Sequence, residues 1–186
     1  MLRTFFFLCL FIACWLWMQI VHELGHVAGA ALTGGRVERV VLHPLTISRT
    51  DVQGSRQLLA VIWAGPIVGC LIPLLAWSIA VAVRSAAAYL FRFFAGFCLL
   101  ANGLYLAAGS FDGVGDCGDL LRHGAPIWTL WLFGAATIPA GLYLWNHQGR
   151  HFGIGEKAET VPPPLQWSTI LLTVATITVE LLLPGG

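Results

Sequence analysis

Charged residues are scarce in this 186-residue chain, because Asp, Glu, Lys and Arg together make up only 10% of it. A soluble globular domain carries roughly 25% charged residues. Hydrophobic residues reach 58%, which is far more than an intrinsically disordered chain contains. The shortage of charge therefore excludes a soluble cytosolic enzyme and a disordered protein, and it indicates an integral membrane protein.

The chain also lacks the excess of positive charge that nucleic-acid binding requires. Its formal net charge is +1 at pH 7, whereas a polybasic nucleic-acid binder concentrates Lys and Arg in one region. We therefore expect no nucleic acid among its partners, the lipid bilayer as its surroundings and the cell membrane as its location. Lys and Arg number about five on each side of the apolar stretches, so the positive-inside rule selects no orientation.

No two cysteines have the CxxC spacing that is typical of zinc and redox sites. Most of the five lie in or beside apolar runs, where a thiol behaves as a small hydrophobe. We predict that they pack between helices and form neither disulfides nor a zinc site. The cysteine among acidic residues, Cys117, is the exception in its surroundings. The five are Cys9, Cys14, Cys70, Cys98 and Cys117.

Long apolar runs, in contrast, are abundant. A helix needs roughly 20 apolar residues to cross a bilayer, and five stretches meet this length. We predict an all-α polytopic membrane protein with about five transmembrane helices, folded as a single membrane-embedded domain over residues 1–186. We expect the first stretch to be a retained helix, since its apolar run is longer than a signal peptide needs. The predicted spans lie near residues 5–31, 58–83, 86–109, 126–147 and 166–183.

Two short segments between the first two apolar stretches are typical of β-strands. Residues 37–42 and 45–52 are rich in β-branched residues in partial alternation, and His43-Pro44 separates them. They predict a short β-ribbon at the membrane surface, between helices one and two. The charges and prolines of residues 148–164 predict an exposed linker.

The string His22-Glu23-Leu24-Gly25-His26 lies within the first apolar stretch. Histidines four residues apart share one face of a helix, so both imidazoles can bind one metal ion. Zn²⁺ accepts nitrogen ligands and keeps an open position in catalytic sites. Glu23 stands where HExxH metallopeptidases carry their general base. Ionisable residues are costly inside an apolar helix and are usually functional, so we predict a zinc site with Glu23 as the catalytic base.

With this motif the chain resembles the site-2 protease family of intramembrane zinc metalloproteases. Two further elements carry the resemblance: Ala64-Gly65-Pro66, like the glycine–proline element of the family, and the acidic, glycine-rich residues 112–119, where the family places its third metal ligand. The resemblance covers about residues 5–125 and implies a minimal member without PDZ or CBS domains. It implies a zinc metalloendopeptidase that hydrolyses a peptide bond in or next to a transmembrane segment of a membrane-anchored protein substrate. It leaves the oligomeric state open.

The resemblance offers two candidates for the third ligand. The family pattern has an Asp before Gly, with apolar residues four and five positions later. Asp112 has the following glycine, whereas Asp116 has Leu120 and Leu121 at the apolar positions. We predict Asp116 as the oxygen ligand, with Asp112 as the alternate. If residues 112–119 form one helix, these two carboxylates and that of Asp119 share a face.

Three further residues are candidates for contact with the substrate carbonyl or its oxyanion. Asn102 is a polar residue in an apolar stretch, and it either steadies an oxyanion or joins two helices through a hydrogen bond. Gly65 and Pro66 are candidates through the resemblance. Because successive helices alternate in direction, the histidines and Gly65-Pro66 are expected roughly 8–14 Å below one membrane surface. The acidic residues 112–119 are expected at the same end.

Two other functions fit parts of the sequence. A non-proteolytic metal-binding membrane regulator or chaperone would have the same fold, but it would have no need of Glu23 as a base. A metal transporter would need several polar positions along one path, and residues 126–184 offer almost none.

Overall fold

A computed structural model describes residues 2–154, 159 and 161–182 of the chain. This part contains five helices that are long and apolar enough to cross a membrane. The prediction of an all-α membrane protein with five spans is confirmed, and the helix ends agree with the predicted ends to within three residues. The five helices are α1 (Leu2–Thr33), α2 (Leu58–Ala82), α3 (Ala88–Asp112), α5 (Ile127–Trp145) and α6 (Pro163–Leu182).

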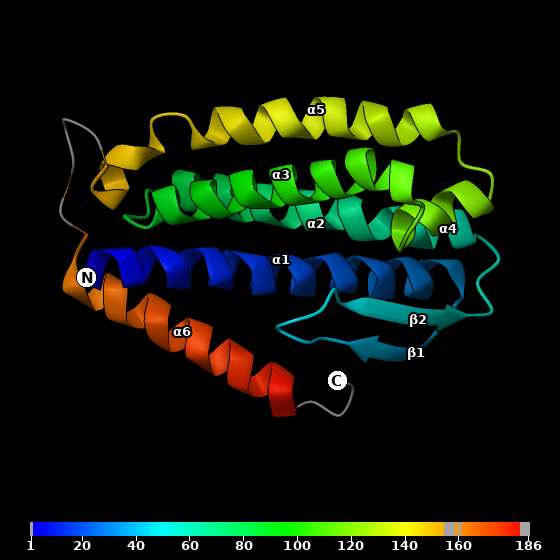
Figure 1. Ribbon diagram of the computed structural model, residues 1–186, viewed down its shortest axis with the longest axis horizontal. Helices are drawn as coiled ribbons and strands as arrows, with labels where there is room; N and C mark the ends of the chain where they lie inside the picture. Colours follow the sequence, from blue (N-terminus) through cyan, green and yellow to red (C-terminus); the bar gives the residue numbers. More distant parts are fainter. Residues whose placement is uncertain (1, 155–158, 160, 183–186) are drawn as a thin grey trace.

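The long helices lie side by side, and α6 diverges from the others along its length (Figure 1). α1 packs against α2, α2 against α3, and α5 against α3, while α6 contacts α1. α1 and α3 run in one direction and α2 runs in the other. The C-terminal ends of α1 and α3 and the N-terminal end of α2 therefore meet at the same end of the bundle. This is the arrangement expected from helices that alternate in direction.

The predicted β-ribbon between helices one and two is confirmed. Its strands are β1 (Arg36–Val41) and β2 (Arg49–Gln53), which pair antiparallel with Val40 opposite Thr50. α1 ends at Thr33, and the next residue, Gly34, has a φ of 72°, a left-handed conformation that glycine adopts without strain. The ribbon then folds back along the C-terminal half of α1, with β2 beside the helix (Figure 1).

The acidic segment after α3 is a helix end, a turn and a second short helix. α3 ends at Asp112, and α4 spans Asp116–Arg122. Between them Gly113 and Gly115 have φ values of 62° and 60°, which a continuing right-handed helix excludes. The common helical face considered for the three aspartates therefore does not form, because two left-handed glycines separate the first from the other two.

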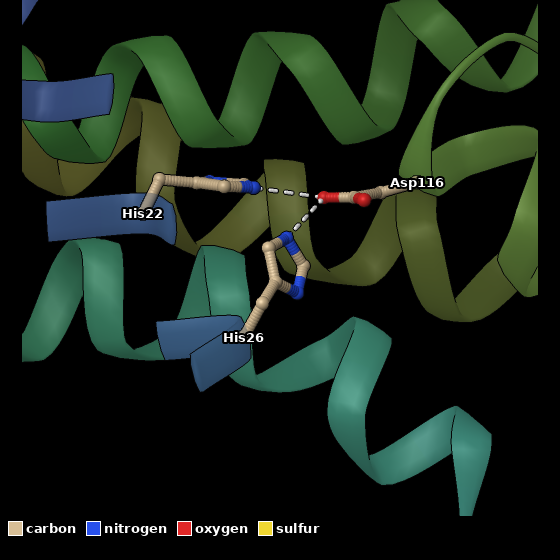
Figure 2. A group of neighbouring side chains, drawn as sticks. All are labelled: His22, His26 and Asp116. Carbon is tan, nitrogen blue, oxygen red and sulfur yellow. Dashed lines mark hydrogen bonds and ion pairs between the residues drawn. The ribbon is translucent and has the colours of Figure 1, made fainter. Parts of the chain in front are cut away.

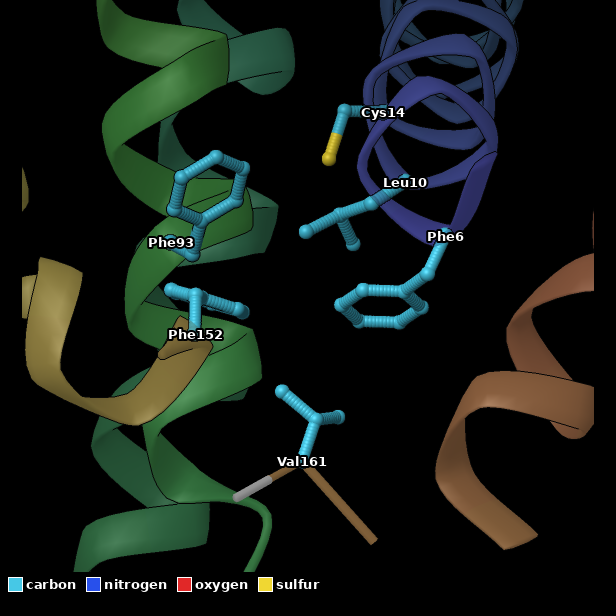
Figure 3. Close-up of a cluster of buried hydrophobic side chains, with 6 residues drawn as sticks. All are labelled: Phe6, Leu10, Cys14, Phe93, Phe152 and Val161. Carbon is cyan, nitrogen blue, oxygen red and sulfur yellow. The ribbon is translucent and has the colours of Figure 1, made fainter. Parts of the chain in front are cut away.

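The expectation of an exposed linker after the fourth span is wrong in part: Arg150, Ile154 and Glu159 are exposed, but other described residues of this segment are buried. Gln148–Phe152 forms a 3₁₀-helix, η1, in which Phe152 is only 2% exposed, and Val161 is equally buried. These apolar side chains pack at the end of the bundle opposite the ribbon. They are buried there although most residues around them in the sequence are polar. Phe152 and Val161 join a buried cluster with Phe6, Leu10, Cys14 and Phe93 (Figure 3). The rest of that segment, residues 155–158 and 160, lies outside the described residues.

All five cysteines are buried and unpaired, as predicted for residues that pack between helices. Cys117 is completely buried, and its thiol donates a hydrogen bond to the carbonyl oxygen of Tyr105 at 3.0 Å. Burial raises the pKa of this thiol to about 11. It therefore stays protonated near neutral pH and differs from a thiolate ligand of a metal.

Candidate metal centre

Three side chains with metal-ligating atoms meet at the ribbon end of the bundle (Figure 2). His22 and His26 extend from one face of α1, and Asp116 is the first residue of α4. Asp116 Oδ2 lies 2.8 Å from His22 Nε2 and 3.3 Å from His26 Nε2. The two histidines are buried, and all three ligand atoms lie within 4.8 Å of one another. The structure thus brings together the three predicted ligands, and metal binding by them stays a prediction.

Asp112, the alternate ligand, lies apart from this group. It is exposed at the last residue of α3. Asp119 forms an ion pair with Arg122 of its own helix. Over residues 2–154, 159 and 161–182, no other group of three His, Cys, Asp or Glu side chains comes close enough together to hold a metal. The geometry therefore favours Asp116 over Asp112.

Hydrogen bonds on the far side of each imidazole determine which nitrogen faces the centre. His26 Nδ1 donates to the backbone carbonyl of Val61 at 3.0 Å, because a carbonyl can only accept. The Asn102 amide donates to the carbonyl of Cys98 at 2.9 Å. This bond turns its Oδ1 toward His22 Nδ1, which donates to it at 2.7 Å. A neutral imidazole that donates from Nδ1 carries its lone pair on Nε2, so both rings present the nitrogen that binds a metal.

A positive charge is needed between these three groups. Burial alone would raise the pKa of the Asp116 carboxyl. When the Nε2 atoms of His22 and His26 are protonated, the hydrogen bonds that they donate outweigh burial and hold that pKa below its usual range. Two nitrogen lone pairs and an ionised carboxylate repel one another unless a cation or added protons lie between them. Ligands at 2.0–2.1 Å from a tetrahedral Zn²⁺ are about 3.3 Å apart. The separation of 3.3 Å between His26 Nε2 and Asp116 Oδ2 matches this spacing. The separation of 2.8 Å between His22 Nε2 and Asp116 Oδ2 is a hydrogen-bond distance, so these two atoms must move about 0.5 Å apart to bind the ion.

Gly65 provides the space in which the two rings lie. A Cβ atom at this position would come within 2.8 Å of His22 Nε2 and would overlap the ring of His26. α1 approaches equally closely at Gly25, where a Cβ would lie 2.8 Å from the Gly65 Cα. Pro66 is fully buried. Gly65 therefore shapes the space around the imidazoles, and a direct contact of Gly65 or Pro66 with substrate stays a prediction.

Of the two roles considered for Asn102, the structure shows the hydrogen bond between helices. Its amide oxygen accepts from His22 on α1, while its nitrogen donates within α3. Only 1% of the residue is exposed, and its amide orients His22. Its role toward an oxyanion stays a prediction.

A cavity of about 1200 Å³ opens over the three ligands, and Glu23 forms part of its wall. The walls come from α1, α2, α3, α4 and the ribbon, including every residue of β2. Glu23 is 5% exposed, and its Oε2 accepts a hydrogen bond from the Thr50 hydroxyl at 2.6 Å. The volume is slightly above the range of about 300–1,000 Å³ for small-molecule pockets, and it suits a segment of extended peptide.

Comparison with known families matches residues 10–111 to the Peptidase M50B-like family. The match covers more than half of the chain. The chain belongs to this family of site-2 protease type. Family membership and the five apolar helices make it an integral membrane protein. Comparisons with curated proteins and with solved structures gave no match.

The matched region of this M50B-like chain contains the histidine motif and Asn102 but ends before α4. Asp116 therefore lies just outside it, and its place at the centre is a finding of the tertiary structure. This agrees with the weaker family pattern around the aspartate.

Sequence reasoning missed Tyr105, which holds the start of α4 in this M50B-like fold. Its hydroxyl accepts a hydrogen bond from the Asp116 backbone N–H at 2.9 Å, and its ring packs edge-on against His22. A signal was present, since Tyr105 follows Asn102 by three residues and so shares its helix face. The sequence alone does not show that α4 packs near this face of α3, so it gives no reason to single out Tyr105.

Replacing Tyr105 with Phe removes this hydroxyl and keeps the ring. We expect zinc affinity to fall roughly fivefold to tenfold, because a hydrogen bond of about 1 kcal/mol no longer holds the backbone of Asp116. Competition with a chelator measures the affinity. Tyr143→Phe is the matched control, since this residue is 72% exposed on α5. Equal affinities of Tyr105→Phe and the wild type would contradict the assigned role.

Two more missed residues, Gln19 and Thr50, attach the ribbon to α1. Gln19 precedes Glu23 by four residues and is a polar residue in an apolar helix, which is a local signal. Nothing local marks Thr50, because its contact with Glu23 depends on how the ribbon folds onto the helix.

Proposed function

We propose that the chain is a zinc metalloendopeptidase that cleaves a peptide bond in or next to a transmembrane segment of a membrane-anchored protein. The observation that carries this proposal is the convergence of two Nε2 lone pairs and the Asp116 carboxylate in a cavity that Glu23 also lines. The family supports the metallopeptidase class. A set of two nitrogen ligands and one oxygen ligand supports zinc with one open position, which is the pattern of catalytic sites.

In this mechanism His22, His26 and Asp116 hold the metal. When bound, Zn²⁺ supplies a Lewis acid for the scissile carbonyl and lowers the pKa of the attacking water. Glu23 takes the proton of that water and passes it to the amine that leaves. The bonds of the two imidazoles to Asn102 and the Val61 carbonyl keep the rings from turning during the reaction.

Burial of the site supports a reaction inside the membrane. The residues His22, Glu23 and His26 are 8%, 5% and 6% exposed, and apolar helices surround them. The cavity is the path by which water and substrate reach them. A peptide in it lies along β2, whose edge away from β1 carries no other strand among the described residues. An extended, unwound substrate segment therefore fits better than a helix.

Zinc content of purified variants tests the ligand set. We expect about one zinc ion per chain in the wild type, and less than about a tenth of that in His22→Ala and in Asp116→Ala, since a catalytic site has only three protein ligands. Asp112→Ala is the matched control and should keep its zinc, because Asp112 lies outside the converging group.

Zinc lost in Asp112→Ala and kept in Asp116→Ala would reverse the choice of the third ligand. A wild-type protein that binds no zinc at any tested concentration would overturn the proposal as a whole.

A further inference from the structure

We propose that Thr50 is a positioning residue that holds Glu23 in the orientation needed for proton transfer. The inference rests on the proposed function, because it concerns the base of that reaction. Its starting point is the 2.6 Å hydrogen bond from Thr50 Oγ1 to Glu23 Oε2. Strand β2 is then part of the catalytic machinery as well as a wall of the cavity.

Two hydrogen bonds of matching spacing dock β2 onto α1. The Ser48 backbone N–H donates to Gln19 Oε1 at 2.7 Å, and Thr50 donates to Glu23. Gln19 and Glu23 are four residues apart, which is about 6 Å along a helix. Ser48 and Thr50 are two residues apart, which is about 6.6 Å along an extended chain. Because the spacing of the two acceptors along the helix matches the spacing of the two donors along the chain, both bonds can form together. The two acceptor residues, Gln19 and Glu23, are each 5% exposed.

The bond to Thr50 restricts a side chain that is otherwise free to turn. A glutamate has three rotatable torsions, so its carboxylate needs a partner to stay in one plane. With Oε2 held by the hydroxyl, Oε1 is the oxygen that takes a proton. A distance of 2.6 Å is in the range of O–H donors to an ionised carboxylate, which are stronger than neutral hydrogen bonds.

The strand holds Thr50 itself in place. Thr50 pairs with Val40 of β1, and the β-branched side chain has few χ1 rotamers available. The hydroxyl therefore comes from a stiff element that is anchored at Gln19, one helical turn before Glu23. A substrate segment that lies along β2 contacts the same strand, so substrate position and base position depend on one element.

Two variants of Thr50 test the role of the hydroxyl. Thr50→Val keeps the branched shape and removes the donor, whereas Thr50→Ser keeps the donor. With labelled casein in detergent as the substrate, we expect kcat to fall about 10- to 100-fold in Thr50→Val, which is the loss of a hydrogen bond to a charged group. We expect KM and zinc content to stay at wild-type values, and Thr50→Ser to recover kcat to within about threefold.

Thr33→Val is the matched control, because the Thr33 hydroxyl bonds to the Gly29 carbonyl and to Ser55 and is remote from Glu23. It should cleave at the wild-type rate. Wild-type kcat in Thr50→Val would overturn the positioning role and leave the proposed function intact. A wild-type chain that cleaves nothing would overturn the proposed function, and the catalytic role of Thr50 with it.

A double-mutant cycle on thermal unfolding tests the contact without any cleavage assay. In the zinc-free protein we expect Thr50→Val to lower the midpoint temperature of unfolding. In a Glu23→Ala background the same change should have no further effect, because the hydrogen bond is already lost. Equal shifts in the two backgrounds would show that Thr50 acts through other contacts, and the proposal would be wrong.

Discussion

Glu23→Gln lowers the rate of casein cleavage about 10²- to 10⁴-fold while zinc content stays at the wild-type level, if Glu23 is the general base. Gln has the same size as Glu and still accepts a hydrogen bond from Thr50, but it cannot take a proton from water. The three ligands are untouched by the change. Initial cleavage rates and zinc content measured on the same preparation separate the chemical step from metal binding.

Glu159→Gln is the matched control for this prediction. Glu159 is exposed, forms an ion pair with His151 and does not line the cavity, and the chemical change is identical. Its cleavage rate should stay within about threefold of the wild type, since surface charge changes have small effects. A Glu23→Gln protein that cleaves like the wild type would exclude Glu23 as the base. Zinc binding without any cleavage by the wild type would instead favour a metal-binding regulator or chaperone with this fold.

Gly65→Ala is expected to remove most zinc binding, with cleavage lost in parallel. The added methyl group would lie 2.8 Å from His22 Nε2 and would overlap the ring of His26. If α2 moved away from the imidazoles, it would lose its close packing against α1 at Gly25, which contacts the backbone at residues 64 and 65. We expect zinc affinity to fall at least about 100-fold and the free energy of unfolding to fall by about 1–3 kcal/mol. Chelator competition and thermal unfolding measure the two effects.

Gly96→Ala separates damage to the site from damage to helix packing. A Cβ at Gly96 would meet the indole of Trp145, with 2.8 Å to its Nε1, far along α3 from the imidazoles. This control should lose stability to a similar degree and keep its zinc affinity. If Gly65→Ala binds zinc as tightly as the wild type, then the close approach of α2 to the imidazoles is not needed for zinc binding, and this prediction is wrong.

The five spans and the ribbon could be predicted from the sequence because each depends on a local pattern. A bilayer requires a continuous apolar run for each crossing, and β-branched residues with a turn between them favour a hairpin. The error lay at residues 148–164, where composition indicated exposure. Burial of Phe152 there depends on partners from α1 and α3, and no local pattern contains them.

The candidate metal centre likewise has one part that a local sequence pattern predicts and another that depends on the tertiary structure. The shared face of His22 and His26 follows from helix geometry alone, since four residues make slightly more than one turn. Choosing between Asp112 and Asp116 required the family pattern, because both carboxylates stand in the same short segment. The turn at Gly113 and Gly115 then decides which of them reaches the imidazoles in the structure.

By itself, the sequence determined a five-span membrane protein with an HExxH motif in its first helix, since hydropathy and helical periodicity act between near neighbours. Only the tertiary structure decided that Asp116 closes the group across 94 residues, that Asn102 and the Val61 carbonyl orient the rings, and that Thr50 reaches Glu23. Such contacts arise from the way helices and a ribbon pack. Packing depends on shape between residues distant in sequence, which no short window records.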